Sequence, residues 1–265
     1  MHDPSSPTGL PRLLEALTRD GAATRWHGSI PDDWLQGRTA YGGVSSAIAL
    51  HCARQVEEAL PPLRSAQIAF VGPLAGAITV EARLLRRGRN AAFVAAEVSG
   101  AQGLGLRCTF VFMRSLAGAL AHERDGGPAV EAPAPDDVVL RGHPQVAFTR
   151  HFAFVDRPDA DDPASWRRWA RLEERDGLHP EVELVAIGDC LPPAALRLLG
   201  MGAPVSSMTW TINLLGAATA SADGWWLVEA VTDHARDGGS SQRMAIRDAA
   251  GRAVAEQIQS VAIFG

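Results

Sequence analysis

The sequence predicts an α+β fold in which the same half-domain occurs twice, and two observations support this prediction. Each half closes with a turn glycine followed by an apolar strand, once at Gly103 and again at Gly251. Each half also contains an earlier strand that runs to a glycine, Gly72 in the first copy and Gly216 in the second. Because this period is far longer than that of a solenoid repeat, it indicates a duplicated domain.

The two copies differ at one position in the closing strand. Val111 stands eight residues after the turn glycine of the first copy, and Gln259 stands eight residues after that of the second. A buried amide costs about 1–3 kcal/mol unless it is hydrogen-bonded, so an apolar strand gives little structural reason for Gln259. The sequence therefore predicts one working site per pair of half-domains, carried by the second copy.

The first half begins with a short helix and a strand, which we expect over 10–19 and 22–28. A long helix is expected from Gly42 to about Leu60, because its apolar residues recur every four positions and form one stripe. These residues are Val44, Ile48, Cys52 and Val56. The pair Pro61-Pro62 is expected to end the helix.

Four strands are expected to follow this helix in series. They span 65–72, 77–86, 91–99 and 104–114. The segment Arg87-Gly88-Arg89-Asn90 suits the turn between the second and the third, since Gly and Asn tolerate a positive φ. One long helix followed by several antiparallel strands indicates a sheet curled around the helix.

A stretch rich in Ala, Pro, Gly and Asp at 116–145 reads as a linker between the copies. We therefore divide the chain into a first half-domain over 1–115, the linker, and a second half-domain over 146–265. The second half is expected to contain a strand at 146–155 and a helical region at 178–199. Its further strands are expected over 205–215, 225–234, 240–247 and 252–264. The segment 165–173 fits a strand or a short helix.

Composition excludes several classes of protein. The net charge of −5 and the lack of a basic run argue against a nucleic-acid partner. Cys52, Cys108 and Cys190 form no CxxC pair and fit buried thiols in a reducing cytosol. The N-terminus lacks the pattern of a signal peptide, and no apolar run approaches the ~18 residues of a membrane helix. We expect a cytoplasmic protein that does not enter a membrane.

Three motifs carry a resemblance to a known family. They are Gly42-Gly43 at the start of the long helix, the turn Arg87-Gly88-Arg89, and the C-terminal segment from Asp248 to Gln259. With them the chain resembles the double hotdog fold of the acyl-CoA thioesterase II (TesB-like) family, over 26–264. That fold joins two tandem hotdog half-domains, each a long helix wrapped by an antiparallel sheet.

The resemblance implies a catalytic set of three residue types, which fall here on Asp189, Ser207 and Gln259. Ser206 and Thr209 are the alternatives for the hydroxyl. The resemblance also implies an acyl-CoA substrate, a place in fatty acid metabolism, no cofactor and a homodimer or higher homo-oligomer. We expect no metal, because no histidine or further acid is placed to complete a shell beside the acidic loops.

These residue types suit thioester hydrolysis, which needs an activated water and donors for the developing oxyanion. Asp189, expected at the start of the second helix, would be the base, with Ser207 and Gln259 orienting the water. Attack by Asp189 itself is the variant we favour less. Backbone N–H groups of Gly42 and Gly43 would serve as oxyanion donors.

Arg87 and Arg89 are candidates for contacts with the phosphates of CoA. Each candidate also has a structural reading: Asp189 as a helix cap, the glycines as packing positions, and the arginines as a solvated turn. Two rival functions stay open, a non-catalytic acyl-CoA or lipid-binding protein and an enoyl-thioester hydratase on the same fold. The sequence does not set the length of the acyl chain.

Overall fold

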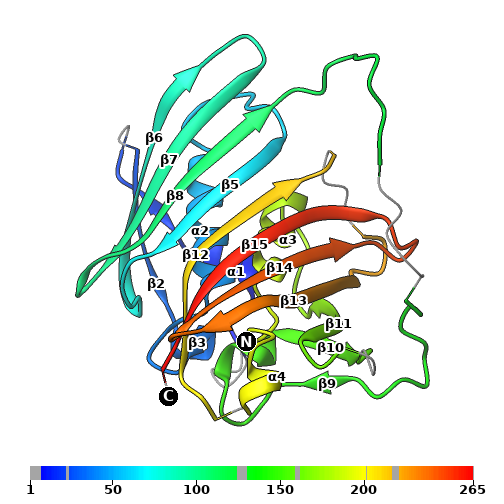
Figure 1. Ribbon diagram of the computed structural model, residues 1–265. Helices are drawn as coiled ribbons and strands as arrows, with labels where there is room; N and C mark the ends of the chain where they lie inside the picture. The colour runs from blue at the N-terminus through cyan, green and yellow to red at the C-terminus, as the bar shows by residue number, and fades with distance from the viewer. Residues whose placement is uncertain are drawn as a thin grey trace.

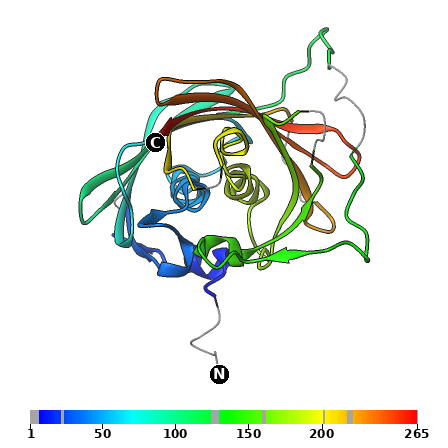
Figure 2. The same cartoon turned by 60° about the horizontal axis from the view of Figure 1, so that its bottom comes forward.

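The structure is a computed structural model, and it describes residues 7–21, 24–123, 130–158, 162–200, 202–216 and 221–264. Its strands form one 13-stranded sheet of order β1-β2-β6-β7-β8-β5-β12-β15-β14-β13-β11-β10-β9 and a separate pair, β3-β4 (Figure 1). All neighbouring strands are antiparallel. The sheet curls around two helices, which therefore lie on its concave side (Figure 2).

The first half contributes two helices, a 3-10 turn and the strands β1 to β8. Its helices are α1 (Leu10–Glu15), the 3-10 turn η1 (Asp32–Trp34) and α2 (Gly42–Ala53). Its shorter strands are β1 (Thr18–Arg19), β2 (Arg25–Ile30), β3 (Leu35–Gln36) and β4 (Thr39–Ala40). Its longer strands are β5 (Leu63–Phe70), β6 (Gly76–Arg87), β7 (Ala91–Gly100) and β8 (Gly103–Met113).

The second half repeats this plan. Its helices are the 3-10 turn η2 (Ala147–His151), α3 (Pro180–Gly188) and α4 (Leu196–Leu199). Its outer strands are β9 (Leu140–Arg141), β10 (Phe152–Asp156) and β11 (Ser165–Leu172). Its remaining strands are β12 (Val205–Leu214), β13 (Trp226–Arg236), β14 (Gly239–Arg247) and β15 (Ala253–Ile263).

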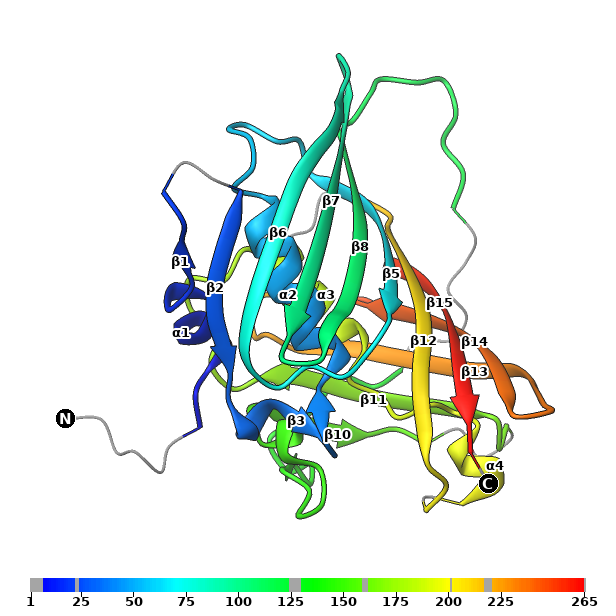
Figure 3. The same cartoon turned by 90° about the vertical axis from the view of Figure 1, so that its left-hand side faces the viewer.

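The predicted duplication is confirmed by the order of the strands. The first half reads β2-β6-β7-β8-β5 and the second reads β11-β13-β14-β15-β12, so that each strand has a counterpart at the same place. The halves join through β5 and β12, which pair from Ala69 with Thr209 to Ser65 with Asn213. Figure 3 shows this junction in the middle of a continuous run of strands.

The helices α2 and α3 lie side by side and antiparallel inside the sheet (Figure 2). Tyr41, which precedes α2, donates its hydroxyl to the backbone oxygen of Ala186 near the end of α3 over 2.6 Å. At the opposite end, Arg54 after α2 forms an ion pair with Glu181 at the start of α3. Both helices are almost entirely buried, which explains why neither carries a polar face.

Several expected element bounds are wrong. The long helix ends at Ala53 instead of about Leu60, because the residues after it turn away and Arg54 reaches across to Glu181. The first helix ends at Glu15 and gives way to β1. The segment expected to be a strand over 146–155 begins with the 3-10 turn η2. The segment 165–173, for which a strand and a short helix were both open, contains the strand β11.

The stretch 116–145, which we predicted to link the halves, contains β9 as its one regular element among the residues that the structure describes. Residues 124–129 lie outside the described part. Within the described part of the chain, no helix is long and apolar enough to cross a membrane.

Candidate active site

The site forms where the beginning of α2 meets the end of α3. Asp189 directly follows α3, so the expectation that it opens the second helix is wrong. Pro180 instead opens that helix, and the ring of His179 accepts the backbone N–H of Glu181 as its cap. Gly188 and Asp189 therefore end α3, whereas Gly42 and Gly43 begin α2. The antiparallel packing of the two helices brings these pairs together.

Gly42 and Gly43 allow this close approach. A Cβ on Gly42 would collide with the Asp189 carboxylate and the Phe70 ring, and one on Gly43 would collide with Tyr41 and the Ala186 carbonyl. The N–H of Gly43, in the first turn of α2, donates to the Asp189 carboxylate. Asp189 is thus the C-cap residue of α3 and also places its carboxylate at the beginning of α2, where the Gly43 donor is already engaged.

Asp189 is half-buried at the wall of a cavity, and desolvation of its carboxyl raises its pKa to about 7. Two hydrogen bonds act in the opposite direction. Gln259 Nε2 donates to Asp189 Oδ1 over 2.7 Å, and the Gly43 N–H donates to the same carboxylate. A carboxyl whose proton is lost near neutral pH is suited to general-base work.

Gln259 points inward from β15 and is 2% exposed. It lies behind Asp189 and does not line the cavity that Asp189 faces, so it holds Asp189 rather than the contents of the cavity. Its expected counterpart Val111 faces the outer side of β8, because the buried positions of that strand are Cys108, Phe110 and Phe112. The inward positions of β8 are thus apolar. The alignment of Val111 with Gln259 that the sequence suggested is displaced by one residue.

Ser207 is the hydroxyl that the strand register turns inward. A bulge between Ser207 and Thr209 inserts Met208, so that Ser207 pairs with the inward-facing Val261 while Thr209 pairs with Ser260. Ser206 also contributes to the cavity wall, and Thr209 does not. In the described part of the chain, Ser207 makes no hydrogen bond to Asp189 or Gln259.

A cavity of about 570 Å³ opens in front of Asp189. Both halves contribute to its wall, which is mainly apolar with a few polar groups. Among its lining residues are Gly42, Phe70, Phe148, Trp166, Cys190 and Leu196, together with the polar Ser45, His143, Arg168 and Ser207. Such a cavity, with one half-buried carboxyl at its wall, is typical of a site for an apolar small molecule.

Arg87 and Arg89 do not join this group. Arg87 closes β6 beside the far end of α2, where its Nε pairs with Glu57 over 3.2 Å, and Arg89 belongs to the next turn. The 12 residues of α2 span roughly 18 Å, and Arg87 lies beyond the end of this helix opposite to Gly42. Neither arginine lines the cavity, so a phosphate contact for them stays a prediction without support from this geometry.

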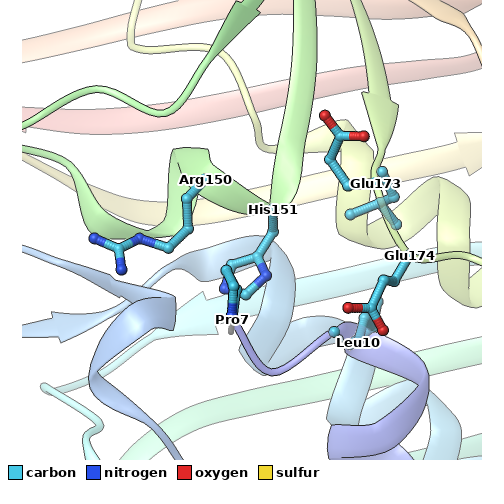
Figure 4. Close-up of a pocket in the computed structure, with 8 residues that line it drawn as sticks. Pro7, Leu10, Arg150, His151, Glu173 and Glu174 are labelled. Carbon is cyan, nitrogen blue, oxygen red and sulfur yellow. The ribbon is translucent and has the colours of Figure 1, made fainter. Parts of the chain in front are cut away.

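A smaller cavity of about 150 Å³ lies between the N-terminal segment and the second half (Figure 4). Arg150 and Glu173 extend away from its centre in this view. His151 stacks on Trp34 with 3.8 Å between ring centroids, and burial lowers the pKa of His151 to about 4. A neutral, stacked histidine that contacts the Asp33 backbone has a packing role, and this cavity assembles no reactive group.

Comparison with known sequences decides the family. The profile of the acyl-CoA thioesterase N-terminal domain matches residues 30–113, and that of the acyl-CoA thioesterase C-terminal domain matches residues 124–263. The chain belongs to the acyl-CoA thioesterase family. No curated protein sequence matches it significantly.

Solved structures of this thioesterase fold superpose over nearly the whole chain. A hot dog fold protein from Alicyclobacillus acidocaldarius has a TM-score of 0.85 at 19% identity, covering 98% of this chain and 99% of its own. The TesB protein of Mycobacterium avium subsp. paratuberculosis has a TM-score of 0.77 at 17% identity, and the acyl-CoA thioesterase II of Mycobacterium marinum one of 0.76 at 16%. Each covers 97% of this chain and 98% of its own. The double hotdog fold is confirmed.

Gln242 is a site residue that the sequence pattern alone did not bring forward. It is fully buried on β14, directly opposite Gln259, and its Nε2 donates to Gln259 Oε1 over 2.7 Å. The signal was present in the sequence, because Gln242 alternates with the apolar Met244 and Ile246 and is therefore an inward amide like Gln259. Gln257, the third inward glutamine, instead accepts the indole N–H of Trp210 over 2.8 Å.

Proposed function

We propose that this thioesterase-family chain hydrolyses an acyl-CoA to the free acid and CoA, with Asp189 as the general base that activates water. The observation that carries the proposal is a half-buried carboxyl with a pKa of about 7 at the wall of a largely apolar cavity. A base with a pKa near the working pH combines a useful ionised fraction with useful basicity.

In this reaction Asp189 takes one proton from a water molecule while the water oxygen attacks the thioester carbonyl. The carbon–sulfur bond then breaks, and the CoA sulfur leaves with the proton that Asp189 returns. Gln259 cannot act as a base because it is an amide, so its part is to hold Asp189 Oδ1 through the bond from its Nε2. This route needs no covalent intermediate on the protein.

The carbonyl oxygen needs a donor as negative charge develops on it. The Gly43 N–H is bound to Asp189, so we assign this part to the backbone N–H of Gly42, which begins α2 on the cavity wall. The first N–H groups of a helix have no partner within the helix, and the helix dipole favours negative charge there. A single such donor is typically worth about 3 kcal/mol in the transition state.

Ser207 faces the same cavity from β12, and we assign its hydroxyl to the water or the substrate carbonyl. Its inward register makes it a better candidate than Thr209. The apolar wall formed by Phe70, Phe148 and Leu196 is the proposed seat of the acyl chain. Homo-oligomerisation stays a prediction from the family resemblance, and light scattering of the purified protein checks it.

The test is CoA release, followed with a thiol reagent, across short, long, branched and aromatic acyl-CoAs. Asp189→Asn keeps the shape of the side chain and removes the base, so we expect turnover to fall by about 10²–10⁴-fold while acyl-CoA binding survives. Enoyl-CoA hydration and equilibrium binding are measured on the same samples. No CoA release from the wild type with any substrate would contradict the proposal, and hydration or binding without release would favour a rival function.

A further inference from the structure

Three amides and one carboxyl form a continuous hydrogen-bonded relay behind the cavity. The Ala194 N–H donates to Gln242 Oε1 over 3.0 Å, Gln242 Nε2 donates to Gln259 Oε1 over 2.7 Å, and Gln259 Nε2 donates to Asp189 Oδ1 over 2.7 Å. Gln242 and Gln259 are 0% and 2% exposed, so water does not compete for these bonds. The relay connects the α3–α4 loop, β14 and β15 to the end of α3.

The direction of this relay is fixed at its far end. A backbone N–H can only donate, so Ala194 requires the oxygen of Gln242 to face it. The Nε2 of Gln242 must then face Gln259, and its other neighbour there is the Met244 sulfur at 3.4 Å, a weak acceptor. Gln259 consequently receives a donor at Oε1, and only its NH₂ group can face Asp189.

We infer that Gln242 is a positioning residue that fixes the direction of the Gln259 amide and thereby holds Asp189 in its carboxylate form. This inference rests on the proposed function for its catalytic consequence and on the geometry alone for its effect on Asp189. Gln242 contacts neither the cavity nor the reacting atoms and acts only through Gln259.

The other titratable and charged groups around Asp189 do not replace this effect. Tyr41, before α2, has its pKa raised well above the usual value by burial, and burial raises the pKa of Cys190 to about 12, so both stay neutral near pH 7. Arg168, from β11, forms an ion pair with Asp156 over 2.6 Å. His143 lines the cavity from the loop before η2 and makes no hydrogen bond to Asp189.

The sign of the effect follows from the two forms of Asp189. The carboxylate accepts a hydrogen bond from Gln259, whereas the protonated acid would need an acceptor for its own O–H. In the wild type Gln259 Oε1 cannot accept that bond, because it faces Gln242 and accepts a hydrogen bond from it. Without Gln242 the Gln259 amide can turn, the protonated acid gains a partner, and the Asp189 pKa rises.

The first experiment is a titration of Asp189 by NMR of ¹³C-labelled aspartate carboxyls in the free protein, with Asp189→Asn identifying the signal. Gln242→Met has a similar volume and no amide, and we expect it to move the midpoint upward by about 1 pH unit. The matched control is Gln257→Met, which removes an equally inward glutamine outside the relay and should leave the midpoint unchanged. Catalysis by Gln242→Met should fall about tenfold at pH 6 and much less at pH 9.

A measurement on the wild type keeps the inference testable even where Gln242→Met does not fold. The side-chain ¹⁵N resonances of Gln242 and Gln259 should shift with the midpoint of Asp189, while that of Gln257 should not. The inference would be overturned if the Asp189 midpoint were unchanged in folded Gln242→Met. It would also be overturned if the side-chain resonance of Gln242 in the wild type did not shift as Asp189 titrates. Because both titrations need no substrate, they separate failure of the relay from failure of the proposed hydrolysis.

Discussion

Asp189 stands between two helix ends that act on its charge in opposite ways. The end of α3, which it follows, carries partial negative charge, whereas the beginning of α2, which it caps, carries partial positive charge. Burial outweighs the bonds from Gly43 and Gln259, so the pKa remains at about 7. In the unfolded chain the same carboxyl would ionise near pH 3.8. This difference in pKa makes the free energy of unfolding depend on pH.

Asp189→Asn should reduce the loss of folding stability that accompanies rising pH. Between pH 5 and about 7 the unfolded chain has already lost this proton while the native state still holds it, so stability falls as pH rises and levels off above the folded pKa. The group should account for about 2–3 kcal/mol of that loss, and Asn removes it. Urea unfolding of both proteins at pH 5 and pH 8 measures the difference; equal pH dependence would show that Asp189 is not perturbed.

At the scale of the elements, the site depends on the alignment of α2 with α3. Tyr41 fixes the end next to Asp189 through its bond to Ala186, and the pair of Arg54 and Glu181 fixes the other end. Glu181 is 3% exposed and also accepts the Leu63 N–H over 2.7 Å, which ties α3 to the first strand of the central junction. Burial raises the pKa of Glu181 and Arg54 opposes it.

Arg54→Met should destabilise the fold by about 3 kcal/mol, because it leaves the Glu181 carboxylate buried without its cation. Adding Glu181→Gln should restore most of this loss, since the uncompensated charge is then gone. Arg25→Met is the matched control: it breaks the exposed pair with Glu81 and should cost less than about 1 kcal/mol. Denaturant unfolding at pH 7 compares the four proteins, and an Arg54→Met loss no larger than that of Arg25→Met would refute this account of the helix pair.

At the scale of the whole molecule, the candidate site requires both halves of the chain. The second half supplies Asp189, Ser207 and Gln259, while the first half supplies the helix beginning at Gly42 and Gly43. The continuous sheet through β5 and β12 holds these parts in register. The duplication has thus produced one polar centre, and the matching inward positions of the first half are filled by apolar side chains such as Phe110.

Alternation and turn glycines were enough to predict the strands and the duplication, because both are local properties of the sequence. Local pattern could not show that Asp189 ends a helix, since a Gly-Asp pair suits either end and only the packing of α3 against α2 decides. The register of Gln242 opposite Gln259 is likewise a tertiary fact. The turn of Arg87 and Arg89 was recognisable, but its distance from the cavity follows from the direction of α2.

The most direct test of Asp189 as the base is the pH dependence of CoA release from pH 5 to 9 with a substrate that the wild type hydrolyses. We predict that kcat/KM rises with pH and levels off above an apparent pKa of about 7, the value at which Asp189 loses its proton. Asp189→Asn should be nearly inactive with no such rise. A wild-type profile that is flat across this range, or an Asp189→Asn variant that keeps the same profile, would contradict the account.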